Sequence, residues 1–227
     1  VYIPYDITSA TYADKSFSIA AQETSPRGLA INPAGTKLFV LGTSGDDVNE
    51  YALSIAFDVS SASFTQAFSI ASQDTNPWGI TFNPTGTKMF TTGLTGVGVD
   101  EFALSSGFDV STASFTQFLS TSAQTATPRG IEFNADGSKM FLVDNAAASI
   151  DEYTLSSGFN VSTASYSQTF SVSANVTEPL GLAFSTDGAE MFVTMVNTTY
   201  EITRYSLSTA FDISTASYTQ RLNVQSA

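Results

Sequence analysis

The chain has 227 residues, with 8 basic and 21 acidic side chains and a formal net charge of −13. This balance disfavours nucleic acid and anionic membranes as partners, because both are bound through clustered Lys and Arg. Cysteine and histidine are absent, which excludes disulfides, thiolate nucleophiles and the commonest general base and metal ligand. No apolar run approaches the roughly 18 residues of a membrane-spanning helix. We therefore expect no cofactor, no metal site, no nucleic-acid partner and no membrane insertion.

Only 13% of the residues are charged, and Ser, Thr, Asn and Gln supply much of the polarity. A hydroxyl-rich, weakly charged and acidic surface is typical of proteins outside the cytoplasm. The composition favours an extracellular location, or one on a cell or virion surface.

A segment of about 15 residues, beginning at Ser25-Pro26-Arg27-Gly28, returns three more times along the chain. The repeated prolines have a constant spacing of 51 residues and are Pro26, Pro77, Pro128 and Pro179. A fixed period of this length is the signature of a repeat architecture, in which each copy buries its apolar face on its neighbours.

Within the first copy, the pattern predicts four short strands in chain order. Strands at 28–32 and 37–41 flank the turn 32–35, where Asn, Pro and Gly stand at the positions that such a turn requires. A third strand is predicted at 48–53, and a fourth at 63–70 follows the connector 57–62. Helical periodicity is absent. The prediction is an all-β fold, a single β-propeller domain over 1–227 with blades at 25–75, 76–126, 127–177 and 178–227.

Charges on the second and third strands of each copy change together. A basic residue and an acidic residue lie 13 positions apart in three copies, and in the fourth both signs are reversed with one residue inserted. Such a swap indicates facing positions of an antiparallel pair, with Phe39 against Val48 in the same register. We interpret these as structural ion pairs: Lys37–Glu50, Lys88–Glu101, Lys139–Glu152 and Glu190–Arg204.

The segment Pro-x-Gly-Leu/Ile-x-Phe/Ile-Asn-x-x-Gly-Thr/Ser-Lys-Met/Leu-Phe resembles the first two strands of the YVTN-type β-propeller repeat. The match covers about a third of each copy. The tetrapeptide that names the family is absent, and 39–42 reads Phe-Val-Leu-Gly. The resemblance implies a propeller blade, but it carries no catalytic residue over from lactonase-type relatives.

The second half of the repeat occurs once more than the first half. It begins at Asp6, Asp58, Asp109, Asn160 and Asp212. Residues 1–24 are therefore predicted to form a surplus outer strand. Three interpretations stay open for Tyr5–Ile19. The strand closes the ring by pairing with the last blade, or it adds to a sheet edge of a neighbouring copy, which means self-association. Alternatively, the chain is one stretch of a longer array.

The residues after the repeated proline differ between copies and would surround one mouth of a central channel. They are Arg27, Trp78, Arg129 and Leu180, and Glu132 adds a charge on an inner strand. Trp with Arg suits stacking on a sugar or gripping a carboxylate, which makes a glycan ligand possible. The alternative is a variable turn, with Glu132 paired to an arginine.

Three Asn-x-Ser/Thr patterns are candidate glycosylation sites: Asn160, Asn175 and Asn197. Taken together, the sequence favours a non-enzymatic structural or adhesive propeller without catalytic residues, such as a subunit of a surface appendage, fibre or viral tail. A carbohydrate-binding propeller is the first alternative. A lactonase-like hydrolase is the second, since no carboxylate pair suited to acid–base chemistry stands out.

Overall fold

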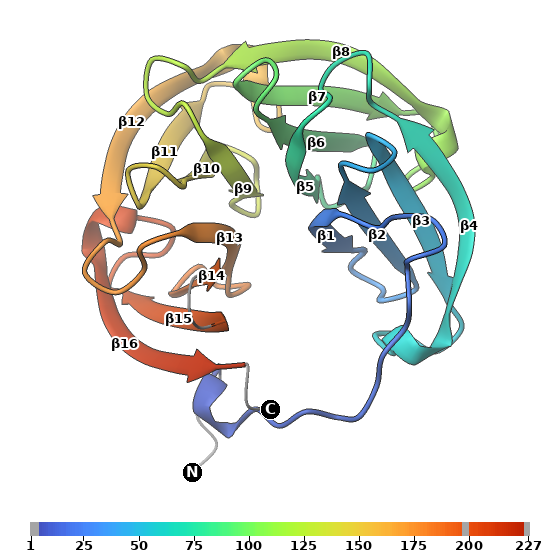
Figure 1. Cartoon of the computed structure of the whole chain (residues 1–227). Helices are drawn as coiled ribbons and strands as arrows, with labels where there is room; N and C mark the ends of the chain where they lie inside the picture. The colour runs from blue at the N-terminus through green and yellow to red at the C-terminus, as the bar shows by residue number, and fades with distance from the viewer. Residues whose placement is uncertain (1–4, 197–199, 225–227) are drawn as a thin grey trace.

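Four antiparallel sheets stand around a common centre like the blades of a propeller (Figure 1). The computed structural model describes residues 5–196 and 200–224. In each blade the first strand lies nearest the centre and the fourth forms the rim. The predicted all-β propeller of four-stranded blades is therefore confirmed. None of the helices among the described residues has the length and apolar character that a membrane crossing needs.

Sixteen strands and five 3-10 turns lie in the described part of the chain. Blade 1 contains β1 Pro26–Ile31, β2 Lys37–Gly42, β3 Asp47–Leu53, η2 Val59–Ser61 and β4 Ala62–Ser69. Blade 2 contains β5 Pro77–Phe82, β6 Lys88–Gly93, β7 Gly98–Leu104, η3 Val110–Thr112 and β8 Ala113–Ser120. Blade 3 contains β9 Pro128–Phe133, β10 Lys139–Asp144, β11 Ser149–Leu155, η4 Val161–Thr163 and β12 Ala164–Ser171. Blade 4 contains β13 Pro179–Phe184, β14 Glu190–Val196, β15 Tyr200–Leu207, η5 Ile213–Thr215 and β16 Ala216–Asn223, and η1 is Ile7–Ser9.

Local side-chain chemistry fixes the first turn of each blade. Asn32 Oδ1 accepts hydrogen bonds from the amides of Thr36 and Lys37 at 2.8 and 2.9 Å. Gly35 has a φ of +69°, a left-handed conformation that costs glycine little. Phe57, in the connector, also has a positive φ, and its ring occupies the space that a Cβ on Gly35 would need. The hairpin and the connector of one blade therefore lock together.

The pairing of the second and third strands differs from the predicted register by two residues. Lys37 lies opposite Ala52, and Glu50 lies opposite Phe39. The same offset holds in blade 4, where Phe192 lies opposite Arg204. Because side chains alternate with a period of two, the shift keeps every residue on its predicted face. The charges therefore meet as diagonal neighbours and not as directly opposed ones.

The charged pair of blades 1, 2 and 3 also holds the next blade. Lys37 Nζ lies 2.7 Å from Glu50 Oε1 and donates to the carbonyl of Phe108 in blade 2 at 2.6 Å. Glu50 Oε2 accepts from Gln66 at 2.8 Å and from the amide of Val110 in blade 2 at 3.1 Å. One nearly buried carboxylate thus links three strands to the following connector.

This arrangement recurs around the ring. Lys88–Glu101 and Lys139–Glu152 span 2.6 and 2.9 Å. In blade 4 the signs are reversed, and Arg204 donates to both carboxylate oxygens of Glu190 at 2.8 and 2.7 Å. The three lysine pairs therefore serve as inter-blade contacts, the blade 4 pair links strands of its own blade, and none of the four lines the central hollow described below.

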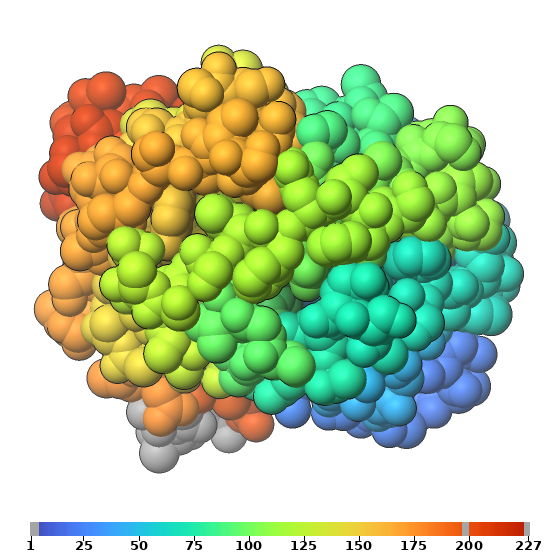
Figure 2. All heavy atoms as spheres, turned by 90° about the horizontal axis from the view of Figure 1, so that it is seen from above, coloured from blue at the N-terminus to red at the C-terminus, as the bar shows by residue number. Residues whose placement is uncertain are grey.

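Apolar side chains fill the three junctions between successive blades. At the first junction, the rings of Phe39 and Phe82 lie 4.5 Å apart between centroids, and Phe108 completes a triad with 5.5 Å to Phe82. The inner strands approach closely because the repeated glycine has no side chain. A Cβ on Gly28 would lie 2.8 Å from the carbonyl oxygen of Trp78. Figure 2 shows the outer segments of blades 1 to 3 packed side by side along the rim.

The ring is interrupted between blade 4 and blade 1. Inner strands β1, β5, β9 and β13 contact each other in that order, while Figure 1 shows that, of the described segments, the N-terminal one alone crosses from the end of β16 toward blade 1. The surplus strand predicted for residues 1–24 does not form over 5–24, the described part of that segment. Among the described residues of this segment the regular structure is η1. A strand needs a neighbour to satisfy its backbone, and no inner strands stand beside this segment.

Candidate functional site

One mouth of the central channel carries a stack of basic and aromatic side chains. Arg27, Trp78 and Arg129 are each the second residue of an inner strand, on β1, β5 and β9. The guanidinium carbon of Arg129 lies 3.3 Å from the centroid of the Trp78 ring, and that of Arg27 lies 4.3 Å from it. Trp78 Nε1 donates to Asn76 Oδ1 at 3.1 Å, which orients the indole. The stack leaves little of the indole face free for a sugar.

The two arginines of this stack have no acidic partner. All eight basic residues lie in the described part of the chain, and the six others form ion pairs. Arg129 Nε and Nη1 are buried without a hydrogen-bond partner. Burial, together with the nearby Arg27, lowers the pKa of Arg129 to about 10. An anion such as a carboxylate would satisfy these donors and relieve the repulsion between the two cations.

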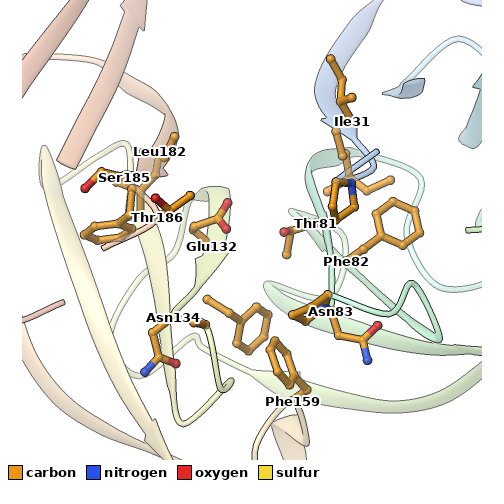
Figure 3. Close-up of a pocket in the computed structure, with 18 of the residues that line it drawn as sticks. Ile31, Thr81, Phe82, Asn83, Glu132, Asn134, Phe159, Leu182, Ser185 and Thr186 are labelled. Atoms are coloured by element: carbon orange, nitrogen blue, oxygen red, sulfur yellow. The ribbon is translucent and has the colours of Figure 1, made fainter. Parts of the chain in front are cut away.

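Beyond this mouth, the inner strands and their turns surround a hollow of about 610 Å³. Its walls are mostly apolar and include Ile80, Phe82, Leu182 and Phe184. Figure 3 shows that Glu132 points into this space, with Thr81 on the facing side. A mostly apolar hollow with a small number of polar groups is the common form of a small-molecule site.

Glu132 is the one ionisable side chain among the described residues that line this hollow. The equivalent positions on the other inner strands carry Ala30, Thr81 and Ala183. Burial raises the pKa of Glu132 to about 7 and outweighs a hydrogen bond from the amide of Phe133, which lowers the pKa. The ion pairs of the described chain do not include Glu132, so the alternative of pairing with an arginine does not hold. A carboxylate with a pKa near neutrality is suited to proton transfer.

The structure thus divides the candidate residues into two groups on one channel. Arg27, Trp78 and Arg129 meet at the mouth, as the repeat symmetry predicts. Glu132 lies three residues further along β9, about 10 Å at the rise of a strand. The fourth residue of the ring, Leu180, carries no charge and is the last before the interruption.

Buried acidic residues were missed by the sequence analysis. Asp74 accepts from the amides of Asn76 and Thr95, at 2.5 and 3.1 Å, and so anchors a loop at the mouth end of blade 2. Asp100 on β7 lies close enough for Asp74 to affect it, and burial together with that neighbour raises the pKa of Asp100 to about 7. The change from Asn49 to Asp100 at one repeat position was a possible signal, but its burial was not visible in the sequence.

The candidate glycosylation residues have ordinary structural contacts. Asn160 Oδ1 caps η4 and accepts from Gln117 at 2.7 Å. The carbonyl of Asn175 accepts from Arg221 at 2.6 Å. Asn197 lies outside the described residues.

Comparison with known proteins places this fold among β-propellers. No protein-family model matches the chain, and no curated protein is significantly similar to it in sequence. Among solved structures, a proposed 6-phosphogluconolactonase from Bacteroides uniformis has a TM-score of 0.56 at 14% identity, covering 85% of this chain and 55% of its own. A similar protein from Bacteroides fragilis has a TM-score of 0.56 at 15% identity, covering 88% and 53%. The periplasmic gluconolactonase of Pseudomonas aeruginosa has a TM-score of 0.52 at 16% identity, covering 87% and 53%.

The chain therefore spans about half the length of the structures that it resembles. Identities this low establish the fold alone. The names of these neighbours nevertheless contradict the predicted non-enzymatic structural or adhesive role, since all three are lactonases by name. They give no support to a filament, adhesin or glycoprotein.

Proposed function

We propose that this protein is a lactonase-like hydrolase whose reaction takes place beside Glu132 in the central hollow. The observation that carries the proposal is a single carboxylate, with a pKa near 7, on the apolar wall of a space large enough for a small ring. The lactonase names of the structural neighbours favour this chemistry over other uses of the hollow. We also propose that the repeat belongs to the YVTN-type class. The proposed location is outside the cytoplasm, as the name of the periplasmic neighbour suggests.

A lactone is a cyclic ester, and its hydrolysis needs one proton removed and one returned. Ionised Glu132 takes a proton from water while the water oxygen forms a bond to the carbonyl carbon. The tetrahedral oxyanion accepts a hydrogen bond from the Thr81 hydroxyl on the facing strand. As the ring C–O bond breaks, Glu132 returns the proton to the leaving oxygen, and a hydroxy acid results. Arg27 and Arg129 would attract an anionic substrate toward a protein that is otherwise strongly negative.

The test compares Glu132→Gln with Glu178→Gln, an exposed glutamate outside the hollow. Hydrolysis of glucono-1,5-lactone and of its 6-phosphate is followed by proton release, with the spontaneous rate subtracted. Removal of a general base should lower kcat about 10²-fold or more in Glu132→Gln and leave Glu178→Gln unchanged. A wild-type rate equal to that of buffer, or full activity in Glu132→Gln, contradicts the proposal.

The pH profile gives a second readout. Because the ionised form of Glu132 acts as the base, kcat/KM should rise with pH through an apparent pKa near 7 and then level off. If kcat/KM does not rise through a pKa near 7, a group other than Glu132 acts as the general base.

A further inference from the structure

Contacts along the rim show how many blade positions separate blade 4 from blade 1. At complete junctions, a glutamine on the rim strand donates to the residue that caps the next 3-10 turn, as Gln66 does to Asp109 at 2.7 Å. Two such steps cross the gap in succession. Gln220 donates to Asp6 at 3.1 Å, and Lys15 lies 2.5 Å from Asp58. Lys15 stands 51 positions before Gln66 and replaces it.

The N-terminal segment also reproduces the connector and rim packing of a blade. Tyr5 has a φ of 60°, like 59° at Phe57. Its ring lies 6.1 Å from Phe192, as that of Phe108 lies 6.3 Å from Phe39. On the other side Phe17 contacts Tyr51 at 5.6 Å, matching a contact of 5.7 Å at the next junction. Residues 5–19 therefore occupy the connector and rim-strand positions of a fifth blade.

Within residues 5–196 and 200–224, no segment fills the inner part of that position beside the two neighbouring blades. No described residue supplies Tyr5 and Phe192 with the middle ring that Phe82, Phe133 or Phe184 supplies at the complete junctions. On blade 1, Leu29 is 63% exposed, whereas its equivalent Ile80 is 6% exposed.

Backbone spacing at the gap agrees with the aromatic pattern. At the complete junctions a Cβ on the repeated glycine would meet the backbone of the next inner strand, as Gly28 would meet Trp78. A Cβ on Gly181 would meet only the side chain of Thr194 in its own blade. The face of β13 is therefore open to the approach of another inner strand.

We propose that the gap binds a three-stranded antiparallel segment of this same repeat, supplied by a polypeptide partner. Its first strand inserts an aromatic residue between Phe192 and Tyr5 and covers Leu29. Its third strand pairs with residues 10–19, which become the fourth strand of a completed fifth blade by β-augmentation. A lysine on its second strand and a glutamate on its third strand bind the connector of blade 1, as Lys88 Nζ donates a hydrogen bond to the carbonyl of Phe159 at 2.6 Å.

A synthetic peptide with residues 127–155, the inner three strands of blade 3, serves as the probe. It is titrated into the full chain by calorimetry, and amide hydrogen exchange is measured over 10–19. We expect saturable one-to-one binding and at least tenfold slower exchange in 10–19, because those amides become paired. Replacing Phe133 of the peptide by Ser removes the middle ring and should weaken binding at least tenfold.

Matched variants of the chain locate the site. Leu29→Asp places a charge on the open face and should abolish binding, while Phe115→Asp, at an exposed rim position of blade 2, should not. If the peptide aggregates, the same segment appended after Ala227 should raise Tm and protect 10–19.

Two results would overturn the proposal. One is the absence of both heat and protection with the peptide and with the appended segment. The other is a dimer of the unmodified chain by light scattering that Leu29→Asp converts to a monomer. That result would show that two copies close the gap on each other.

Discussion

Replacing Asp100 with Asn should stabilise the protein increasingly as the pH rises from 5 to 8. Asp100 is 4% exposed, and burial raises the pKa of its carboxyl from 3.8 to about 7. The folded state binds this proton more tightly than the unfolded state does. The contribution of Asp100 is therefore full below pH 3.8 and is lost as the pH approaches 7. A shift of about 3 pKa units corresponds to about 4 kcal/mol, of which about 2 kcal/mol falls between pH 5 and 7.

The substitution suits the repeat, because Asn49 occupies the same position in blade 1. Urea unfolding at pH 5 and pH 8 gives the two free energies of unfolding for each variant. Asp109→Asn is the control, since hydrogen bonds hold the pKa of that carboxyl below its usual value and blade 3 carries Asn160 there. It should show no pH-dependent difference in this range. An Asp100→Asn gain that is equal at both pH values, or absent at pH 8, refutes the reasoning.

Two further substitutions test the junctions between blades by urea unfolding. Gly79→Ala should lower the free energy of unfolding by about 1–3 kcal/mol, because its Cβ would overlap the carbonyl oxygen of Arg129. Gly181→Ala is the control, since only a side chain must move there, and an equal loss in that variant would contradict the prediction. Glu101→Gln should lower the free energy of unfolding by about 2–3 kcal/mol. This is less than the loss for a fully buried ion pair, because Lys88 is about a third exposed. Adding Lys88→Met to the same chain should recover part of the loss. If the double variant recovers no stability, the loss in Glu101→Gln does not come from the unpaired lysine.

Most of the blade could be predicted because its signals are local. Asn32 and Gly35 define their turn through contacts within a few residues, and Asp58 caps η2 through the amide of Ser60. The register could not be fixed, because direct and diagonal neighbours both explain a pair of charges that change together. The strand expected at Tyr5–Ile19 failed because strand formation depends on a neighbouring strand, which a half-repeat does not carry.

The candidate site was predicted only where repeat symmetry governs it. Equivalent positions must face one axis, so Arg27, Trp78 and Arg129 could be grouped from spacing alone. The perturbed acids Glu132 and Asp100 depend on burial by other blades, which spacing does not reveal. The isolation of Glu132 from any arginine is likewise a matter of three-dimensional distance.

Because the hairpin glycine and the connector phenylalanine are in contact, two positions that are distant in the sequence are expected to be conserved together. The ring of Phe108 overlaps the place where a larger residue at Gly86 would project, so neither can change alone without loss. Both are identical in all four copies, although the loops around them have diverged. The fifth connector, which lacks a hairpin beneath it, carries Tyr5 instead. An aromatic ring and a left-handed backbone are therefore retained even there, because the connector residue also packs against the neighbouring blade.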